Sequence, residues 1–80
     1  MSTYHIHYFG LLAERRGLAD ETTAIDAATA DEIYGILAAR HALGITRAAV
    51  RVAVNDELVP WSHPLQDGDR IALLPPMSGG

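Results

Sequence analysis

The chain has 80 residues, a net charge of −4 and no cysteine. This length is enough for one small domain, and a disulfide framework or a thiolate metal site is excluded. Acidic residues outnumber basic ones and no basic stripe is present, which argues against nucleic-acid binding. No apolar run approaches the about 20 residues of a membrane span, and no secretory signal pattern is present. We therefore expect a cytoplasmic protein without a membrane partner.

The first part of the chain predicts a strand, a short helix and a second strand. Thr3–Phe9 alternates between two faces with β-branched and aromatic residues, which is typical of a β-strand. Leu11–Arg16 has the length of one or two helical turns, and Gly17 is expected to end it. Thr22–Asp26 indicates a second, weaker strand.

A capping-box pattern at Thr29–Glu32 predicts the start of the main helix. In this motif the threonine hydroxyl accepts from the N–H three residues on, and the glutamate reaches back to the cap N–H. The buried stripe of the helix is expected to contain Ile33, Ile36, Leu37 and Ala39 or Arg40. Gly35 costs about 1 kcal/mol relative to alanine inside a helix, which indicates close packing there. Gly44 is the expected stop signal.

The second half of the chain predicts only strands and turns. The alternating run Val50–Val54 is a third strand, and Asn55-Asp56 forms a tight turn into a short return strand at Leu58–Val59. After a turn at Asp67–Asp69, the apolar run Ile71–Leu74 is expected to be a central strand. This order predicts an α+β fold of the β-grasp, ubiquitin-like type, a mixed sheet with one main helix across one face.

The chain ends in Pro75–Gly80, which we interpret as a flexible tail (75–80) on a β-grasp domain (1–74). Two terminal glycines place a carboxylate on a slender lead, because glycine has no Cβ and adopts φ angles closed to other residues. Two prolines favour an extended form, and six residues span about 20 Å. The proline pair is also consistent with a strand terminator, and a diglycine alone with a linker scar.

Several segments along nearly the whole chain form one recognisable pattern. They are Tyr8-Phe9-Gly10 with Leu12, Glu14 and Gly17, then Val52–Val59, then Pro64-Leu65 before Asp67-Gly68-Asp69, and finally Ala72–Gly80 with its Pro-Pro-x-Ser-Gly-Gly ending. On these residues the chain resembles the small subunit of molybdopterin synthase, the MoaD family of ubiquitin-like sulfur carriers in the MoaD/ThiS superfamily.

The resemblance implies that the reacting group is the carboxylate of Gly80. An E1-like adenylating enzyme of the MoeB type would activate it with ATP, and a sulfur donor such as a cysteine desulfurase or rhodanese would leave a C-terminal thiocarboxylate. A MoaE-like large subunit, in a heterotetramer, would then pass the sulfur to cyclic pyranopterin monophosphate. With no cysteine and no recognisable catalytic triad, the chain is expected to be a non-catalytic sulfur-donor subunit with no bound cofactor.

The same scheme assigns roles to residues near the tail. The residues expected to lie in a channel of the partner are Pro75, Pro76, Met77, Ser78 and Gly79. Phe9 and Leu74 are expected to form an exposed apolar interface beside the root of the tail. Trp61 is better explained as a cover over the edge of the core than as a partner anchor.

No metal site is expected. His5 and His7 share a strand face, but two ligands are too few, and His41 and His63 have no spacing that adds them.

Three other functions stay open at this point. One is a sulfur carrier for another pathway, such as thiamine synthesis or amino-acid thiolation, although thiamine-pathway carriers usually lack the proline pair. The second is a ubiquitin-like modifier that forms isopeptide bonds with lysines of target proteins. The third is a β-grasp interaction module whose diglycine is incidental.

Overall fold

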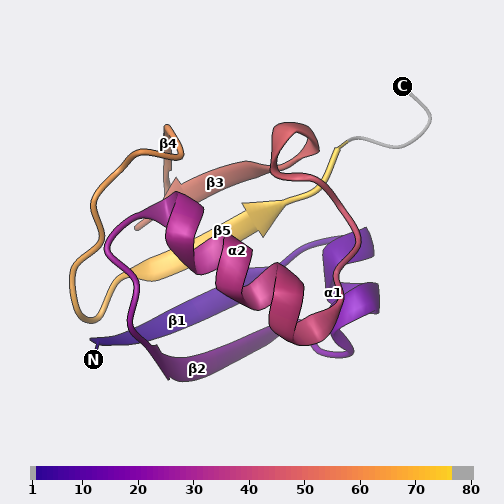
Figure 1. The fold of residues 1–80 in the computed structure, drawn as a ribbon, viewed down its shortest axis with the longest axis horizontal. Coiled ribbons are helices and arrows are strands. Elements are labelled where there is room, and N and C mark those ends of the chain that lie inside the picture. The colour runs from indigo at the N-terminus through magenta and orange to yellow at the C-terminus, as the bar shows by residue number, and fades with distance from the viewer. Residues whose placement is uncertain (1, 77–80) are drawn as a thin grey trace.

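The computed structural model describes residues 2–76 and contains one five-stranded sheet. The elements are β1 (Ser2–Tyr8), α1 (Leu11–Arg16), β2 (Asp20–Ile25), α2 (Ala30–His41), the 3₁₀ turn η1 (Arg47–Ala49), β3 (Arg51–Val54), β4 (Glu57–Val59) and β5 (Arg70–Leu74). The strand order is β2-β1-β5-β3-β4, and α2 lies across one face (Figure 1). The predicted β-grasp fold is confirmed. Within the described residues no helix is long and apolar enough to cross a membrane.

The first and last strands pair at the centre of the sheet. β1 runs parallel to β5, whereas β1–β2, β3–β4 and β3–β5 are antiparallel. β5 therefore has a hydrogen-bonded neighbour on both sides, which explains why its sequence lacks the strong polar alternation of an edge strand. The prediction of a central last strand beside the first is confirmed.

The core lies between the sheet and α2. Tyr4, Ile6 and Tyr8 of β1 point into it, together with Ile71 and Leu73 of β5, and all are at most 3% exposed. The buried residues of α2 are Ala30, Ile33, Tyr34 and Leu37.

The predicted stripe of α2 is therefore right for Ile33 and Leu37 and wrong for Ala39 and Arg40, which are exposed. Ile36 is only partly buried. Tyr34 is also buried, although it was not among the residues expected in this stripe. Its hydroxyl donates to the carbonyl of Ile45, so its polar end is paired at the edge of the core.

The ends of α2 differ in detail from the prediction. Thr29 accepts from the Glu32 N–H at 3.2 Å, as expected, but the Glu32 carboxylate accepts from the N–H of Ala28 rather than of Thr29. The helix ends at Ala42, which takes the left-handed conformation with φ 51°. Gly44 is not the stop, because the chain already turns back at Ala42 to bury Leu43 completely.

Two glycines have roles other than those predicted. Gly44, with φ +71°, leaves space for the side chain of Arg15, because a Cβ at this position would lie 2.6 Å from Arg15 Nη1. Arg15 Nη1 donates to the carbonyl of Leu43 at 2.8 Å. Gly35 does not mark close packing, because a Cβ at this exposed position would meet nothing within 4 Å.

A polar network around Glu21 ties α1 to the sheet. Arg16 donates from Nε and Nη2 to the two carboxylate oxygens of Glu21, each at 2.9 Å. The hydroxyl of Tyr8 donates to the same carboxylate at 2.6 Å, and His41 Nε2 lies 4.0 Å away. The hydrogen bonds from Arg16, supported by the one from Tyr8, lower the pKa of Glu21 to about 2. The network therefore holds β1, α1 and β2 together as long as Glu21 is ionised.

Replacing Glu21 with Gln should lower the free energy of unfolding at neutral pH by about 2 kcal/mol, because charged hydrogen bonds are lost. The pKa of Glu21 is depressed in the fold, so its contribution is present above the unfolded-state pKa of about 4.3 and is lost as the pH falls towards 2. Urea denaturation across this pH range should show a shallower loss of stability for E21Q than for the wild type.

The matched control is Asp56→Asn, which alters an exposed ion pair. Asp56 Oδ2 lies 2.7 Å from Arg70 Nη2, but the aspartate side chain is 86% exposed. We expect a change below about 1 kcal/mol at neutral pH. An E21Q variant as stable as the wild type at neutral pH would contradict the assigned role of the network.

Candidate functional site

The face of the sheet opposite α2 carries an apolar surface across its middle strands. Strand register places His7 of β1, Ala72 of β5, Ala53 of β3 and Leu58 of β4 in one row. Because side chains alternate along a strand, this row faces away from the core that Leu73 enters. The side of the sheet opposite α2 therefore carries the imidazole ring of His7, the methyl groups of Ala72 and Ala53, and the side chain of Leu58 in one row.

Phe9 and Leu74 extend this surface towards the C-terminal end of β5. Phe9 is 45% exposed and Leu74 is half-buried, while Leu58 in the row is 58% exposed. We call Phe9, Leu58 and Leu74, with the methyl groups of Ala53 and Ala72 between them, the open-face patch. A small hollow of about 160 Å³ adjoins it, and Phe9 and Ala72 are among its lining residues. Both interface residues expected from the sequence thus lie on one face, and their contact with a partner stays a prediction.

Leu58 was not among the interface residues expected from the sequence. Its position follows from the tight turn at Asn55 and Asp56, whose φ angles are 53° and 72°. A two-residue turn of this kind fixes the register of the hairpin, so that Leu58 pairs with Ala53. The signal was present in the sequence, because the turn was predicted and the register follows from it.

The root of the tail adjoins the same patch. The Phe9 N–H donates to the carbonyl of Leu73 at 3.2 Å. A Cβ at Gly10, where φ is +53°, would lie 3.0 Å from Pro75 Cγ, so the proline ring packs directly over the Gly10 backbone. Pro75 is half-buried and Pro76 is exposed. The chain therefore leaves the domain beside Phe9.

The remaining tail residues named from the sequence are Met77, Ser78, Gly79 and Gly80. They lie outside the described residues, so their expected roles, including that of the Gly80 carboxylate, remain predictions.

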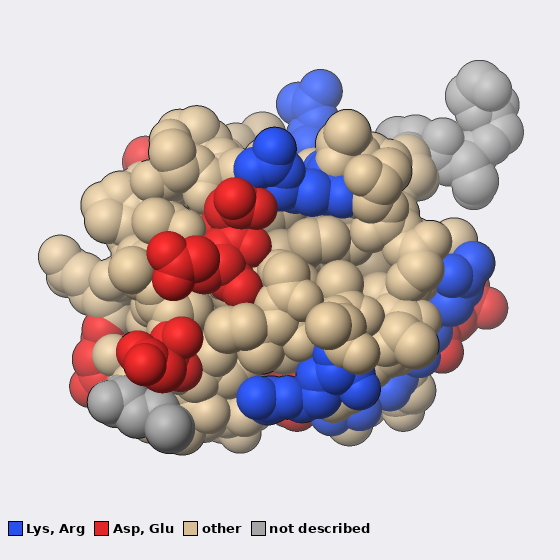
Figure 2. Space-filling model, in the orientation of Figure 1, with Lys and Arg blue, Asp and Glu red and all other residues tan. Residues whose placement is uncertain are grey.

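The α2 side of the molecule carries charged groups towards its edges. Figure 2 shows acidic side chains gathered on the left of this face and arginine side chains at its upper, lower and right-hand edges. Arg47 Nη1 pairs with Asp31 Oδ1 there at 3.1 Å.

Trp61 is partly buried against the core, and the centroid of its ring lies 5.3 Å from that of Tyr34. The prediction that Trp61 covers the edge of the core is confirmed.

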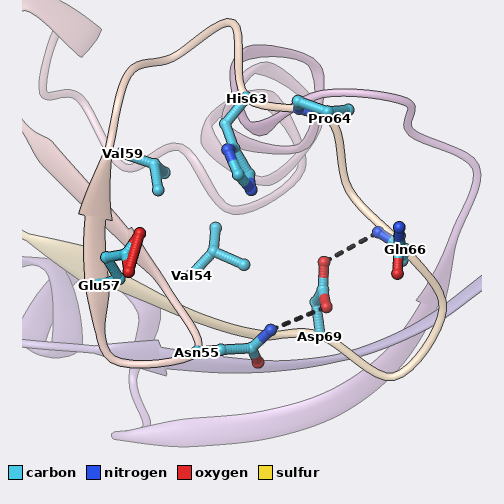
Figure 3. Close-up of a pocket in the computed structure, with 8 residues that line it drawn as sticks. All are labelled: Val54, Asn55, Glu57, Val59, His63, Pro64, Gln66 and Asp69. Carbon is cyan, nitrogen blue, oxygen red and sulfur yellow. Dashed lines mark hydrogen bonds between the residues drawn. The ribbon is translucent and has the colours of Figure 1, made fainter.

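A shallow cavity of about 370 Å³ lies between the β3–β4 hairpin and the loop before β5 (Figure 3). One of its two carboxylates, that of Asp69, accepts from Asn55 Nδ2 at 3.0 Å and from the N–H of Gln66 at 2.8 Å. These bonds organise the two turns and leave the carboxylate engaged. The lining residue Asp69 directly precedes β5, whereas Pro75 at the root of the tail follows the other end of that strand.

Comparison with known proteins gives one family for this fold and this C-terminal arrangement. The ThiS family matches residues 6–80. The chain belongs to the ThiS family. The chain is also similar to the molybdopterin synthase sulfur carrier subunit of Escherichia coli K12, to which it is 36% identical over 76 residues that cover 91% of this chain and 94% of that protein. The protein of the same name from Chlamydomonas reinhardtii is 35% identical over 77 residues, 91% of this chain and 93% of that one.

Solved structures agree with this family. SAMP1 from Haloferax volcanii superposes with a TM-score of 0.81 at 26% identity, covering 99% of this chain and all of that one. A complex of subunits 1 and 2 of the molybdopterin-converting factor from Helicobacter pylori contains a chain with a TM-score of 0.68 at 32% identity, covering 98% of this chain and 99% of that chain. The resemblance to the small subunit of molybdopterin synthase is thereby confirmed.

Substitution of two leucines distinguishes a residue of the open-face patch from a residue of the core. Leu58→Ala should change the free energy of unfolding by less than about 0.5 kcal/mol, because the side chain is 58% exposed. Leu73→Ala should cost about 3 kcal/mol, because that side chain is fully buried. Chemical denaturation of both variants checks this, and similar losses for the two would mean that Leu58 serves the fold rather than a partner.

Proposed function

We propose that this chain is the sulfur carrier of molybdopterin synthesis and that the carboxylate of Gly80 carries the sulfur. The main support is the 36% identity, over 91% of the chain, to a molybdopterin synthase sulfur carrier subunit. The arrangement of the site agrees, because the open-face patch and the root of the tail are contiguous at Phe9 and Pro75. A partner that covers the patch therefore also receives the tail.

The chemistry follows from the state of a C-terminal carboxylate. Its pKa lies near 3.5, so it is ionised at neutral pH and is a poor acyl donor. In the proposed cycle, an E1-like enzyme of the MoeB type lets this carboxylate attack the α-phosphorus of ATP, which releases pyrophosphate and forms an acyl adenylate. The terminal persulfide sulfur of a desulfurase or rhodanese donor then displaces AMP and forms an acyl disulfide with Gly80. A thiol reductant attacks the donor's cysteine sulfur, which forms a new disulfide there and leaves a thiocarboxylate on Gly80. The catalytic groups belong to the partners in this scheme, and the chain supplies the acyl group.

The proposed acceptor complex is formed with a MoaE-like large subunit, in a heterotetramer. The Helicobacter pylori structure of a molybdopterin-converting factor complex contains a chain 32% identical to this one, which supports a large-subunit partner. Phe9, Leu58 and Leu74 would be buried against that subunit. Arg51, which is exposed and pairs with Leu74 in the strand register, supplies a charge at the rim of the patch.

The proposal is tested by intact-mass analysis of protein isolated from its native host. We expect a fraction of the chain in which one oxygen is replaced by sulfur, and fragmentation should map the change to Gly80. After incubation with the large subunit and cyclic pyranopterin monophosphate, this fraction should return to the unmodified mass. A sulfur-free chain in cells that actively make molybdopterin would contradict the proposal.

Removing Gly80 should abolish sulfur transfer while the fold is unchanged. The shortened tail reaches about 3.3 Å less far, and reactions lose about a hundredfold in rate when a reacting group is misplaced by 1 Å. A single-turnover assay with purified partners measures the transfer, and circular dichroism measures the fold. An added residue after Gly80 should have the same effect, and normal transfer with such a blocked end would overturn the role of this carboxylate.

Leu58→Glu should weaken binding of the large subunit by about tenfold or more, because a carboxylate is forced into an apolar contact. Gly35→Glu is the matched control, since it adds the same side chain at an exposed position on α2 where nothing lies within 4 Å. Calorimetric titration of both variants with the large subunit measures the difference. Equal affinities would place the docking surface somewhere other than the open-face patch.

A second candidate function is that of a protein modifier. It is favoured by the structural likeness to SAMP1 of Haloferax volcanii, a small archaeal modifier protein, at a TM-score of 0.81. A modifier would appear in the mass analysis as adducts joined through Gly80 to lysines of other proteins. Such adducts without any thiocarboxylate would favour this function over sulfur transfer.

A further inference from the structure

Three potential metal ligands meet near the edge of the open face, on β1 and β2. His5 and His7 lie on the same side of β1, and Asp20 of β2 pairs with His7 in the strand register. One ligand atom from each of these residues lies within 4.8 Å of the others. The third ligand was not visible in the sequence, because only the pairing of the two strands brings Asp20 beside the histidines.

One separation in this cluster, which now forms a hydrogen bond between His5 and Asp20, already suits a bound ion. His5 Nε2 lies 3.2 Å from Asp20 Oδ2, and the two imidazole rings have centroids 4.6 Å apart. Zinc bonds of about 2.0 to 2.2 Å in tetrahedral geometry place ligand atoms about 3.4 Å from one another. His5 and Asp20 already meet this spacing. The side chains of His5 and Asp20 are 38% and 53% exposed, which gives an ion direct access from solvent.

We propose that His5, His7 and Asp20 form a binding site for a divalent transition-metal ion of the zinc type. Two imidazole nitrogens and one carboxylate oxygen suit zinc, nickel or copper, whereas magnesium and calcium prefer a shell of oxygen ligands. Three protein ligands leave a fourth coordination position for water or for a donor from another molecule. The site is independent of the sulfur-carrier proposal and uses none of the tail residues.

The position of the site gives it a relation to the open-face patch. The ring of His7 is stacked beside that of Phe9, with centroids 6.2 Å apart and an interplanar angle of 22°. A bound ion would fix the orientation of His7 and add positive charge at the border of the patch. Metal occupancy would therefore alter the surface that a partner of this face meets.

The test is a calorimetric titration of the full chain with Zn²⁺ near neutral pH. The unmodified protein is used, so that a thiocarboxylate sulfur cannot act as a ligand. We expect one Zn²⁺ per chain and no binding of Mg²⁺ under the same conditions. His7→Gln and Asp20→Asn should each weaken Zn²⁺ binding by about tenfold or more, since one ligand is lost. His63→Gln is the control and should bind as the wild type does, because His63 lines the cavity beside the start of β5.

Histidine ring signals in NMR spectra of the wild type provide a second measurement that needs no variant. Substoichiometric Zn²⁺ should shift the ring signals of His5 and His7 and leave those of His41 and His63 in place. The proposal is overturned if Zn²⁺ does not bind, if H7Q and D20N bind it as tightly as the wild type, or if the shifts appear at His41 or His63. If a variant fails to fold, the wild-type spectra decide alone.

Discussion

The parallel pairing of β1 with β5 is the constraint on which the rest of the structure depends. It joins the two ends of the domain. The inward side chains of the two strands, such as Ile6 and Leu73, belong to the core that α2 covers. The same pairing continues past the strands in the hydrogen bond from Phe9 to Leu73, and the Pro75 ring then packs over Gly10. The place where the tail leaves the domain is therefore set by the centre of the core.

A consequence of this pairing is that the two faces of the sheet have different tasks. Ile71 and Leu73 of β5 are fully buried on the side of the sheet that α2 covers. Ala72 and Leu74 point to the opposite side of the sheet and belong to the open-face patch. Small residues at Ala72 and Ala53 leave room for the larger side chains around them. The polar network of Glu21 joins β1, β2 and α1 through the hydrogen bonds of Tyr8 and Arg16. This part of the fold is therefore stabilised without the open-face patch.

The sequence predicted those parts of the fold that depend on local pattern. Alternation located β1 and β3, the cap at Thr29 located α2, and turn residues located the hairpin, so the β-grasp order followed. One error arose where a distant contact overrides a local signal, because burial of Leu43 ends α2 before Gly44. The other arose because a glycine inside a helix does not require a close neighbour, and Gly35 has none. For the site, Phe9 and Leu74 followed from their nearness to the tail, and Leu58 could have followed from the turn. Asp20 could not, because strand pairing alone brings it to His5 and His7.

The size of the open-face patch is itself informative about the kind of binding it can support. The patch has only three large apolar side chains, whereas stable permanent interfaces bury about 2,000 Å² or more. A carrier that must load on one enzyme and unload on another needs to leave both, and weak docking through a small patch favours rapid release. In the proposed cycle, Pro75–Gly80 would add contact in a channel of the partner. Specificity for the correct partner would then depend on the patch and the tail together, because a partner that binds the patch but lacks the channel would make only part of the contact.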